Sequence, residues 1–297
     1  MPQFAIIDAP SILGLRPTGV QYLPEALKAA GLMNKLKAEY KGRVLSLPYN
    51  PQRDKSTTLL NPHTIRAFSL QLAEKVISVL HKKQFPIVLG GDCSILIGNL
   101  LALKQMVGSD SSRYGLFFID GHADFYQPEA SLTGEVADMD LAIVSGRGPD
   151  ILTDIEGLKP LVLDQDIVVF GYRDGDQAAS YGSQDVYETN MHLFDLEKVH
   201  TLGITHAASL AIEKLMNNDL AGFWIHLDVD VLDDEIMPAV DYRLDGGLSF
   251  SDLSELLKII LGSKCAVGMD ITILNPLLDV DGSITHRFVS SIVAGLS

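Results

Sequence analysis

The sequence contains few cysteines, few basic residues and no long apolar run. Two cysteines among 297 residues cannot form a disulfide framework. Lys plus Arg number 23 against 38 Asp plus Glu, a net charge of −15, and nucleic acid or an anionic membrane would repel such an acidic chain. No apolar run reaches the roughly 18 residues of a transmembrane helix, and the first residues do not form a secretion signal. We therefore expect a cytoplasmic protein that acts on a small molecule, without a nucleic-acid or membrane partner.

Apolar and amphipathic segments alternate along the whole chain. Apolar residues make up 47% of it and charged residues 21%, which is typical of a globular protein. The expected strands are 4–7, 43–48, 86–91, 115–120, 167–173, 223–230 and 266–271. The segments with helical spacing are 24–37, 61–83, 95–106, 206–218 and 251–262. This alternation predicts a three-layer αβα fold with a mostly parallel sheet. No linker or repeat divides the chain, so we expect one domain over residues 1–297.

Two of the expected strands end in closely spaced carboxylates. Asp120 closes an apolar strand, and His122 and Asp124 follow at alternate positions, so the three side chains point the same way in an extended chain. Asp228 and Asp230 end another strand with the same spacing, and two buried carboxylates on one face require a cation. Ligands bind beyond the carboxyl ends of parallel strands. These five residues therefore predict a centre for two divalent ions that activates water.

Two further residues adjoin these motifs. Gly90 and Gly91 permit a tight turn after a third strand, and Cys93 follows as a sixth candidate ligand. His226 lies two residues before Asp228 and therefore points to the same face of the strand, so it either lines the site or packs beside it.

These motifs resemble those of the ureohydrolase family, which comprises arginases, agmatinases and formimidoylglutamases. The family markers GGDHS, DAHxD and SxDxDxxDP correspond to GGDCS at 90–94, DGHAD at 120–124 and HLDVDVLDD at 226–234. Three weaker similarities cover residues 8–32, 171–176 and 267–276, and they extend the resemblance from end to end. The resemblance implies the fold shared by arginases and deacetylases, with about eight strands in one sheet, and a homo-oligomer, either a trimer or a hexamer.

The resemblance also implies a role for each ligand. Asp120 and Asp228 would bridge two metal ions, most often Mn²⁺ in this family. Asp124 would bind the first metal, whereas His122 and Asp230 would bind the second. A metal-bridging hydroxide would attack the guanidino carbon of the substrate, and Asp124 would pass a proton to the amine that leaves, which fits the need of an amine for a proton before it departs.

Three positions depart from the family pattern. Cys93 stands where the first metal-binding histidine is expected. A thiolate there would favour zinc, iron or cobalt over manganese, whereas a neutral thiol would leave the first site weak. Ala137 replaces the loop histidine proposed as a proton shuttle, for which Glu135 or Asp138 could substitute. Ile273 replaces the glutamate that pairs with the guanidinium, so the identity of the substrate stays open.

Other residues retain the family's substrate-binding positions. Asp174 and Asp176 match the carboxylates of the motif GxRDxD, which help to bind the α-amino end of a substrate. Thr133 and Glu135 lie in the segment that matches the substrate loop. These four residues are the predicted substrate contacts.

Three functions are compatible with this pattern. The first is an arginase-like hydrolase of linear C–N bonds that converts a guanidino or amidino compound to an amine plus urea or ammonia. The second is an amide hydrolase with a single metal held by Asp120, His122 and Asp228, similar to the zinc site of the deacetylases that share the fold. The third is a catalytically impaired member with a binding or assembly role. Metal content and the effect of chelation distinguish them.

Overall fold

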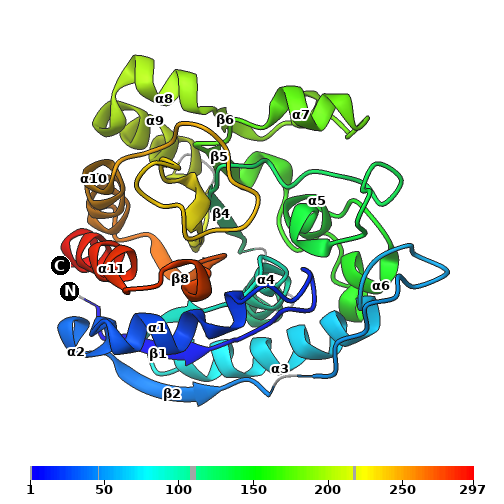
Figure 1. The fold of residues 1–297 in the computed structure, drawn as a ribbon, viewed down its shortest axis with the longest axis horizontal. Helices are drawn as coiled ribbons and strands as arrows, with labels where there is room; N and C mark the ends of the chain where they lie inside the picture. The colour runs from blue at the N-terminus through cyan, green and yellow to red at the C-terminus, as the bar shows by residue number, and fades with distance from the viewer. Residues whose placement is uncertain (1, 46, 108–111, 217–218) are drawn as a thin grey trace.

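A single eight-stranded parallel sheet forms the centre of the protein (Figure 1). The computed structural model describes residues 2–45, 47–107, 112–216 and 219–297. The strand order is β2-β1-β3-β8-β7-β4-β5-β6, and every described pair is parallel. The strands are β1 Phe4–Asp8, β2 Glu39–Arg43, β3 Phe85–Leu89, β4 Tyr114–Ile119, β5 Ile167–Phe170, β6 His192–Phe194, β7 Gly222–Asp228 and β8 Ala266–Thr272.

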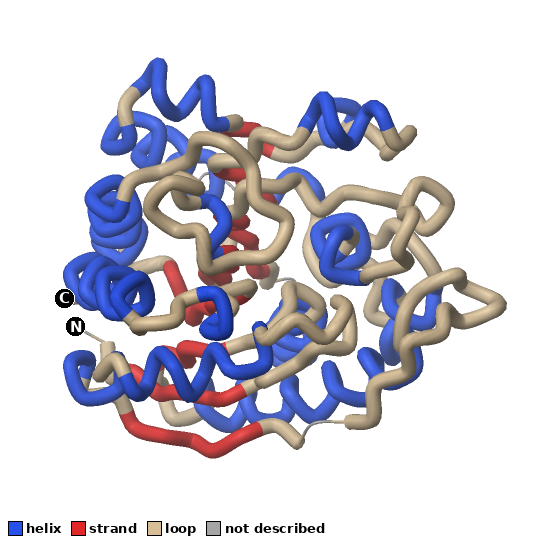
Figure 2. Tube along the Cα trace, viewed as in Figure 1, coloured by secondary structure: helices blue, strands red, loops and turns tan. Residues whose placement is uncertain are grey.

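Helices cover both faces of this sheet (Figure 2). The helices that pack on one face are α1 Leu23–Ala29, α2 Leu32–Leu36, α8 Leu196–Leu202, α9 Ile204–Met216, α10 Phe250–Gly262 and α11 Ser283–Leu296. Those on the other face are α3 Pro62–Leu80, α4 Ile95–Val107, α5 Asp140–Val144 and α6 Asp150–Thr153, while α7 Gly175–Ser180 has no buried residue. Short 3-10 turns lie at 20–22, 136–138, 155–157, 164–166, 186–188, 229–231 and 276–278. None of the helices in the described ranges combines the length and apolarity needed to cross a bilayer.

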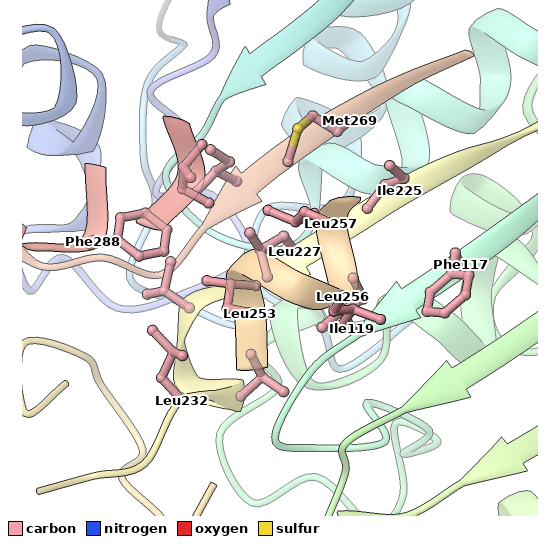
Figure 3. Close-up of a cluster of buried hydrophobic side chains, with 14 of the residues drawn as sticks. Phe117, Ile119, Ile225, Leu227, Leu232, Leu253, Leu256, Leu257, Met269 and Phe288 are labelled. Carbon is pink, nitrogen blue, oxygen red and sulfur yellow. The ribbon is translucent and has the colours of Figure 1, made fainter. Parts of the chain in front are cut away.

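Side chains of the central strands fill both layers because they alternate. Phe117 of β4 points into the core beneath α10, whereas Phe118 faces the opposite layer. Figure 3 shows the first of these cores, where Leu253 and Leu257 of α10 lie close to Leu227 of β7. The strands at the middle of the sheet are thus buried on both faces, which fixes where their polar carboxyl ends emerge.

The three-layer α/β fold predicted from the sequence is confirmed, with differences at its margins. The strand expected at 43–48 is wrong. The chain pairs with β1 through Glu39–Arg43 instead; Val44 is buried and Leu45 is exposed, and Ser46 lies outside the described residues. The helix expected at 24–37 is interrupted at Gly31, whose φ of 92° is left-handed. Strand β6 and helix α11 are not among the elements predicted from the sequence.

Candidate metal centre

The predicted ligands gather where four neighbouring strands end. β3, β8, β7 and β4 are adjacent in the sheet. Asp228 is the last residue of β7, and Asp120 directly follows β4. Cys93 lies in the turn between β3 and α4, and Thr272 ends β8. Parallel strands bring these four residues to one edge although they are far apart in the chain.

Four of the potential metal donors form an inner group. The donor atoms of Cys93, Asp120, His226 and Asp228 all lie within 4.8 Å of one another, and the four side chains are buried. The Cys93 thiol donates to Asp228 Oδ2 over 2.8 Å, and Thr272 Oγ1 lies 3.4 Å from the same sulfur atom. The inner group therefore combines a sulfur, an imidazole and two carboxylates, which are zinc-type ligands.

Three donors form an outer group that shares Asp120 with the first. His122 Nδ1 lies 2.9 Å from Asp230 Oδ2 and 3.7 Å from Asp120 Oδ1. These three donor atoms also lie within 4.8 Å of one another. A carboxylate common to two adjacent donor groups is what a pair of bridged ions requires.

Asp124 belongs to neither group, although it lines the same cavity. Its backbone has a left-handed φ of 43°, which ends the extended run on which the sequence prediction relied. Burial, followed by the negative charges of Asp120 and Asp140, raises the pKa of Asp124 well above its ordinary value. Asp124 can therefore hold a proton in the absence of cations.

Hydrogen bonds from backbone N–H groups fix the loop that carries these candidate ligands. Asp230 Oδ1 accepts from Gly121 N over 3.0 Å, and Asp120 Oδ1 accepts from His122 N over 2.6 Å. Only glycine fits at position 121, because a Cβ there would lie 2.5 Å from Arg173 Nη1 and 2.7 Å from Asp230 O. Arg173 also donates to Asp230 O over 2.9 Å, so it ties the two ligand loops together.

Unbalanced negative charge dominates the electrostatics of the site. Burial and the neighbouring carboxylates Asp230 and Asp120 raise the pKa of Asp228 well above its usual range. Burial opposes protonation of His122, but the charges of Asp230 and Asp120 prevail and raise the pKa of that imidazole. Burial also raises the pKa of the Cys93 thiol, with Asp228 as the next cause. Each shift signals a site that a cation would stabilise.

A cavity of about 180 Å³ leads to these groups. Leu15, Ala137 and Ile273 form apolar parts of its wall. Its acidic lining residues besides the predicted ligands are Glu135, Asp138 and Asp241. Burial raises the pKa of Asp138 to about 7, and its Oδ1 atom has no hydrogen-bond partner among the described residues. Glu135 is already bonded, because it accepts from Arg16 N over 3.0 Å and from the Tyr242 hydroxyl over 2.5 Å.

The four predicted substrate contacts separate into two pairs. Thr133 and Glu135 line the cavity. Asp174 and Asp176 do not: Asp174 accepts from Ala123 N over 3.0 Å and so supports the ligand loop, while Asp176 is exposed at the start of α7. The same segment contributes Gln177 and Tyr181 to the cavity instead, which the motif did not indicate.

Two residues beside the predicted ligands had no defined role in the prediction from the sequence. His226 was assigned either a lining or a packing position, and its Nε2 atom belongs to the inner donor group. Asp140 was not considered at all. It is fully buried, neither of its oxygens has a hydrogen-bond partner in the described structure, and it lies 3.9 Å from His226 Nε2. The only signal for His226 in the sequence was its place two residues before Asp228 on one strand, which puts both side chains on the same face of the sheet.

Comparisons with known proteins agree with the family resemblance. The model of the Arginase family matches residues 2–297. An arginase of Staphylococcus aureus (strain COL) is 31% identical over 294 residues, which cover 96% of this chain and 94% of that protein. The solved arginase of Bacillus caldovelox superposes with a TM-score of 0.87 at 25% identity, over 100% of this chain and 99% of that one. The agmatine ureohydrolase of Thermoplasma volcanium, at 18% identity over 99% of this chain and 88% of that one with a TM-score of 0.69, shares the fold.

Proposed function

This chain belongs to the arginase family, and we propose that it is a metal-dependent hydrolase of a linear C–N bond in a guanidino or amidino compound. Cleavage of the substituted C–N bond of a guanidino group would give an amine and urea, whereas cleavage of a terminal C–N bond would give ammonia and a ureido or amide product. The observation that carries this proposal is the pair of donor groups that share Asp120 beside a cavity with acidic walls. A cytoplasmic location and a trimeric or hexameric assembly remain predictions from the sequence.

The donors present suit two divalent ions. Asp120 Oδ2 and His226 Nε2 are buried and lack hydrogen-bond partners in the described part of the chain, and a cation would satisfy both. The outer group consists of hard oxygens and one imidazole, which Mn²⁺ accepts, whereas the sulfur of Cys93 suits zinc, iron or cobalt at the inner group. When bound, such ions lower the pKa of water and polarise the substrate.

The reaction also needs a group that moves a proton. Hydrolysis forms a bond from a water oxygen to the substrate carbon and breaks the C–N bond, and the departing nitrogen must receive a proton. Asp124 lines the cavity and has a raised pKa, because burial and neighbouring carboxylates disfavour its charged form. We assign to Asp124 the transfer of that proton to the leaving amine.

The cavity favours a substrate with a positive charge. Ile273 offers no charge there, whereas Asp138 lines the cavity and its buried Oδ1 atom has no hydrogen-bond partner among the described residues. Glu135 has less capacity, since Arg16 and Tyr242 already donate to it. We therefore assign recognition of the substrate cation to Asp138, with Thr133 as a neighbouring polar contact.

The single-metal alternative is less well supported by the geometry. It needs His122 and Asp228 around one ion, yet His122 groups with Asp230 and Asp228 groups with Cys93. Two metal ions per chain would favour the proposed reaction, and a single zinc ion would favour an amide hydrolase. The non-catalytic alternative predicts no turnover at any metal loading.

A substrate panel tests the proposal. The purified protein is loaded separately with Mn²⁺, Co²⁺, Ni²⁺ or Zn²⁺ and incubated with guanidino, amidino and ureido compounds and with acetylated amines, while urea, ammonia and acetate release are measured. We expect urea or ammonia from at least one cationic compound, and its loss in Asp228→Asn. The exposed substitution Glu197→Gln on α8, at a residue outside the predicted site, is the control. Absence of turnover with every metal and compound would refute the proposal.

A further inference from the structure

His226 is a buried histidine of β7 that the family motif does not assign to the metal centre. It lies two residues before Asp228 in the same strand, so both side chains point to the same side of the sheet. The side chain has no solvent exposure. A histidine in such a place is either a ligand or part of a buried ion cluster, and its surroundings distinguish the two.

The ring of His226 is held in one orientation. Its Nδ1 atom lies 2.5 Å from Asp270 Oδ2, and the ring stacks on Phe118 with 4.7 Å between centroids. Asp270 is itself fixed, because its Oδ1 atom accepts from Trp224 Nε1 over 2.5 Å and from Asn99 Nδ2 over 2.9 Å. A carboxylate that accepts from one imidazole nitrogen sets the tautomer and leaves the lone pair on the other nitrogen.

That other nitrogen is directed at the metal centre. His226 Nε2 has no hydrogen-bond partner in the described structure, and its nearest carboxylate is Asp120 Oδ2 at 3.7 Å, which is also unpartnered. Metal–donor bonds of about 2.0–2.3 Å in a tetrahedral site separate the donors by roughly 3.3–3.8 Å. The observed spacing is therefore that of two ligands of one ion, and it is too long for a good hydrogen bond.

We propose that His226 is a ligand of the inner metal ion, which Cys93, Asp120 and Asp228 complete as a four-donor site. The imidazole missing from the turn after β3 is thus supplied by β7, and Asp270 is its positioning residue. Coordination would remove the proton from the Cys93 thiol. The two ions then have unlike surroundings: sulfur, nitrogen and oxygen at the inner site, and nitrogen and oxygen at the outer site. The inner site should prefer Zn²⁺ or Co²⁺ to Mn²⁺.

Metal binding tests this proposal without any substrate. Metal-free protein is titrated with Co²⁺, and the thiolate-to-cobalt absorption band reports the inner site. We expect His226→Gln to weaken the band-forming site by at least about 100-fold, and Asp270→Asn to weaken it by about 10–100-fold. The exposed substitution His206→Gln should leave both sites unchanged, and His122→Gln should lose only the outer ion.

X-ray absorption keeps the test independent of the folding of the His226 variant. In His122→Gln, the remaining cobalt ion should show one sulfur and one imidazole among its neighbours. A cobalt ion without an imidazole in that variant, or an unchanged band and affinity in His226→Gln, would overturn the proposal in favour of a buried cluster of His226 with Asp140 and Asp270. The inference rests on the same centre as the proposed function, but the two can fail separately. Correct metal binding without turnover refutes only the function, and full turnover in His226→Gln refutes only the ligand assignment.

Discussion

Replacing Asp138 by asparagine should make the stability of the metal-free protein less dependent on pH. Burial raises the pKa of Asp138 to about 7, against about 3.9 for a solvated aspartate. In the wild type, the folded state therefore binds a proton that the unfolded chain releases. The stabilisation is complete below pH of about 4, falls as the pH rises and is lost once the pH passes about 7. Asparagine is neutral throughout and lacks this dependence.

The size of the effect follows from the shift. A difference of about three pKa units, at about 1.36 kcal/mol per unit, amounts to about 4 kcal/mol. This is an upper bound, because Asp138 keeps partial contact with the cavity. The hydrogen bond from Ser131 Oγ to Asp138 Oδ2, 3.0 Å long, can be kept by the amide oxygen of asparagine. The two proteins should consequently be of similar stability near pH 4.

Urea denaturation between pH 4 and pH 8.5, in the presence of a chelator, measures the difference. We expect the free energy of unfolding of Asp138→Asn to exceed that of the wild type increasingly with pH, with most of the gain between about pH 4 and pH 7. Asp176→Asn, at an exposed position of α7, controls for the loss of one surface charge. A difference that stays constant over this range would show that Asp138 is not a neutral buried acid.

Three further outcomes test the centre and the cavity. Chelation should lower the melting temperature measured by calorimetry. Adding back metal at a free concentration 100 times its dissociation constant should raise the free energy of unfolding by about 2.7 kcal/mol per site. An unchanged melting temperature on chelation would mean that the centre is vestigial. Gly121→Ala should destabilise the fold by about 1–3 kcal/mol and weaken metal binding, because the added Cβ would collide with Arg173 and Asp230. The control is Gly262→Ala, where the added Cβ meets no atom within 4 Å and should stabilise the helix by up to about 1 kcal/mol. Ile273→Glu adds a carboxylate to the cavity wall and should raise kcat/KM for arginine by at least about tenfold; an unchanged value would contradict a cationic substrate in that part of the cavity.

The layers of the fold and the strand-end carboxylates could be predicted because both are local properties of the chain. An apolar run that ends in Asp120 or Asp228 indicates both a buried strand and the edge at which it ends. The edge strand β2 could not be predicted in the same way. Its residues are mostly exposed and polar, and its pairing with β1 is a long-range contact. The three residues of β6 give too short a pattern to recognise.

Side-chain orientation was less predictable than side-chain location. Asp174 occupies a motif position associated with substrates, yet its carboxylate turns towards Ala123 N because the ligand loop needs an acceptor there. His226 has the correct parity to reach the centre, but its orientation depends on Asp270, which is 44 residues away on β8. The position of a residue along a strand determines the face to which its side chain points. The partner of that side chain, and for a histidine its tautomer, depend on residues of the neighbouring strand.

The three residues that depart from the family pattern lie around one cavity. Cys93, Ala137 and Ile273 line the same cavity, so their effects combine at one site. Two of them remove polar groups from the wall, whereas Asp138 Oδ1 and His226 Nε2 have no hydrogen-bond partner among the described residues, and His226 Nε2 belongs to the inner donor group. A site that was merely decaying would have no reason to keep His226 Nε2 and Asp120 Oδ2 buried without hydrogen-bond partners in the described structure, since unpaired buried polar groups cost stability. These observations support our proposal that the cavity retains hydrolytic metal chemistry and holds its first metal and its substrate through different residues.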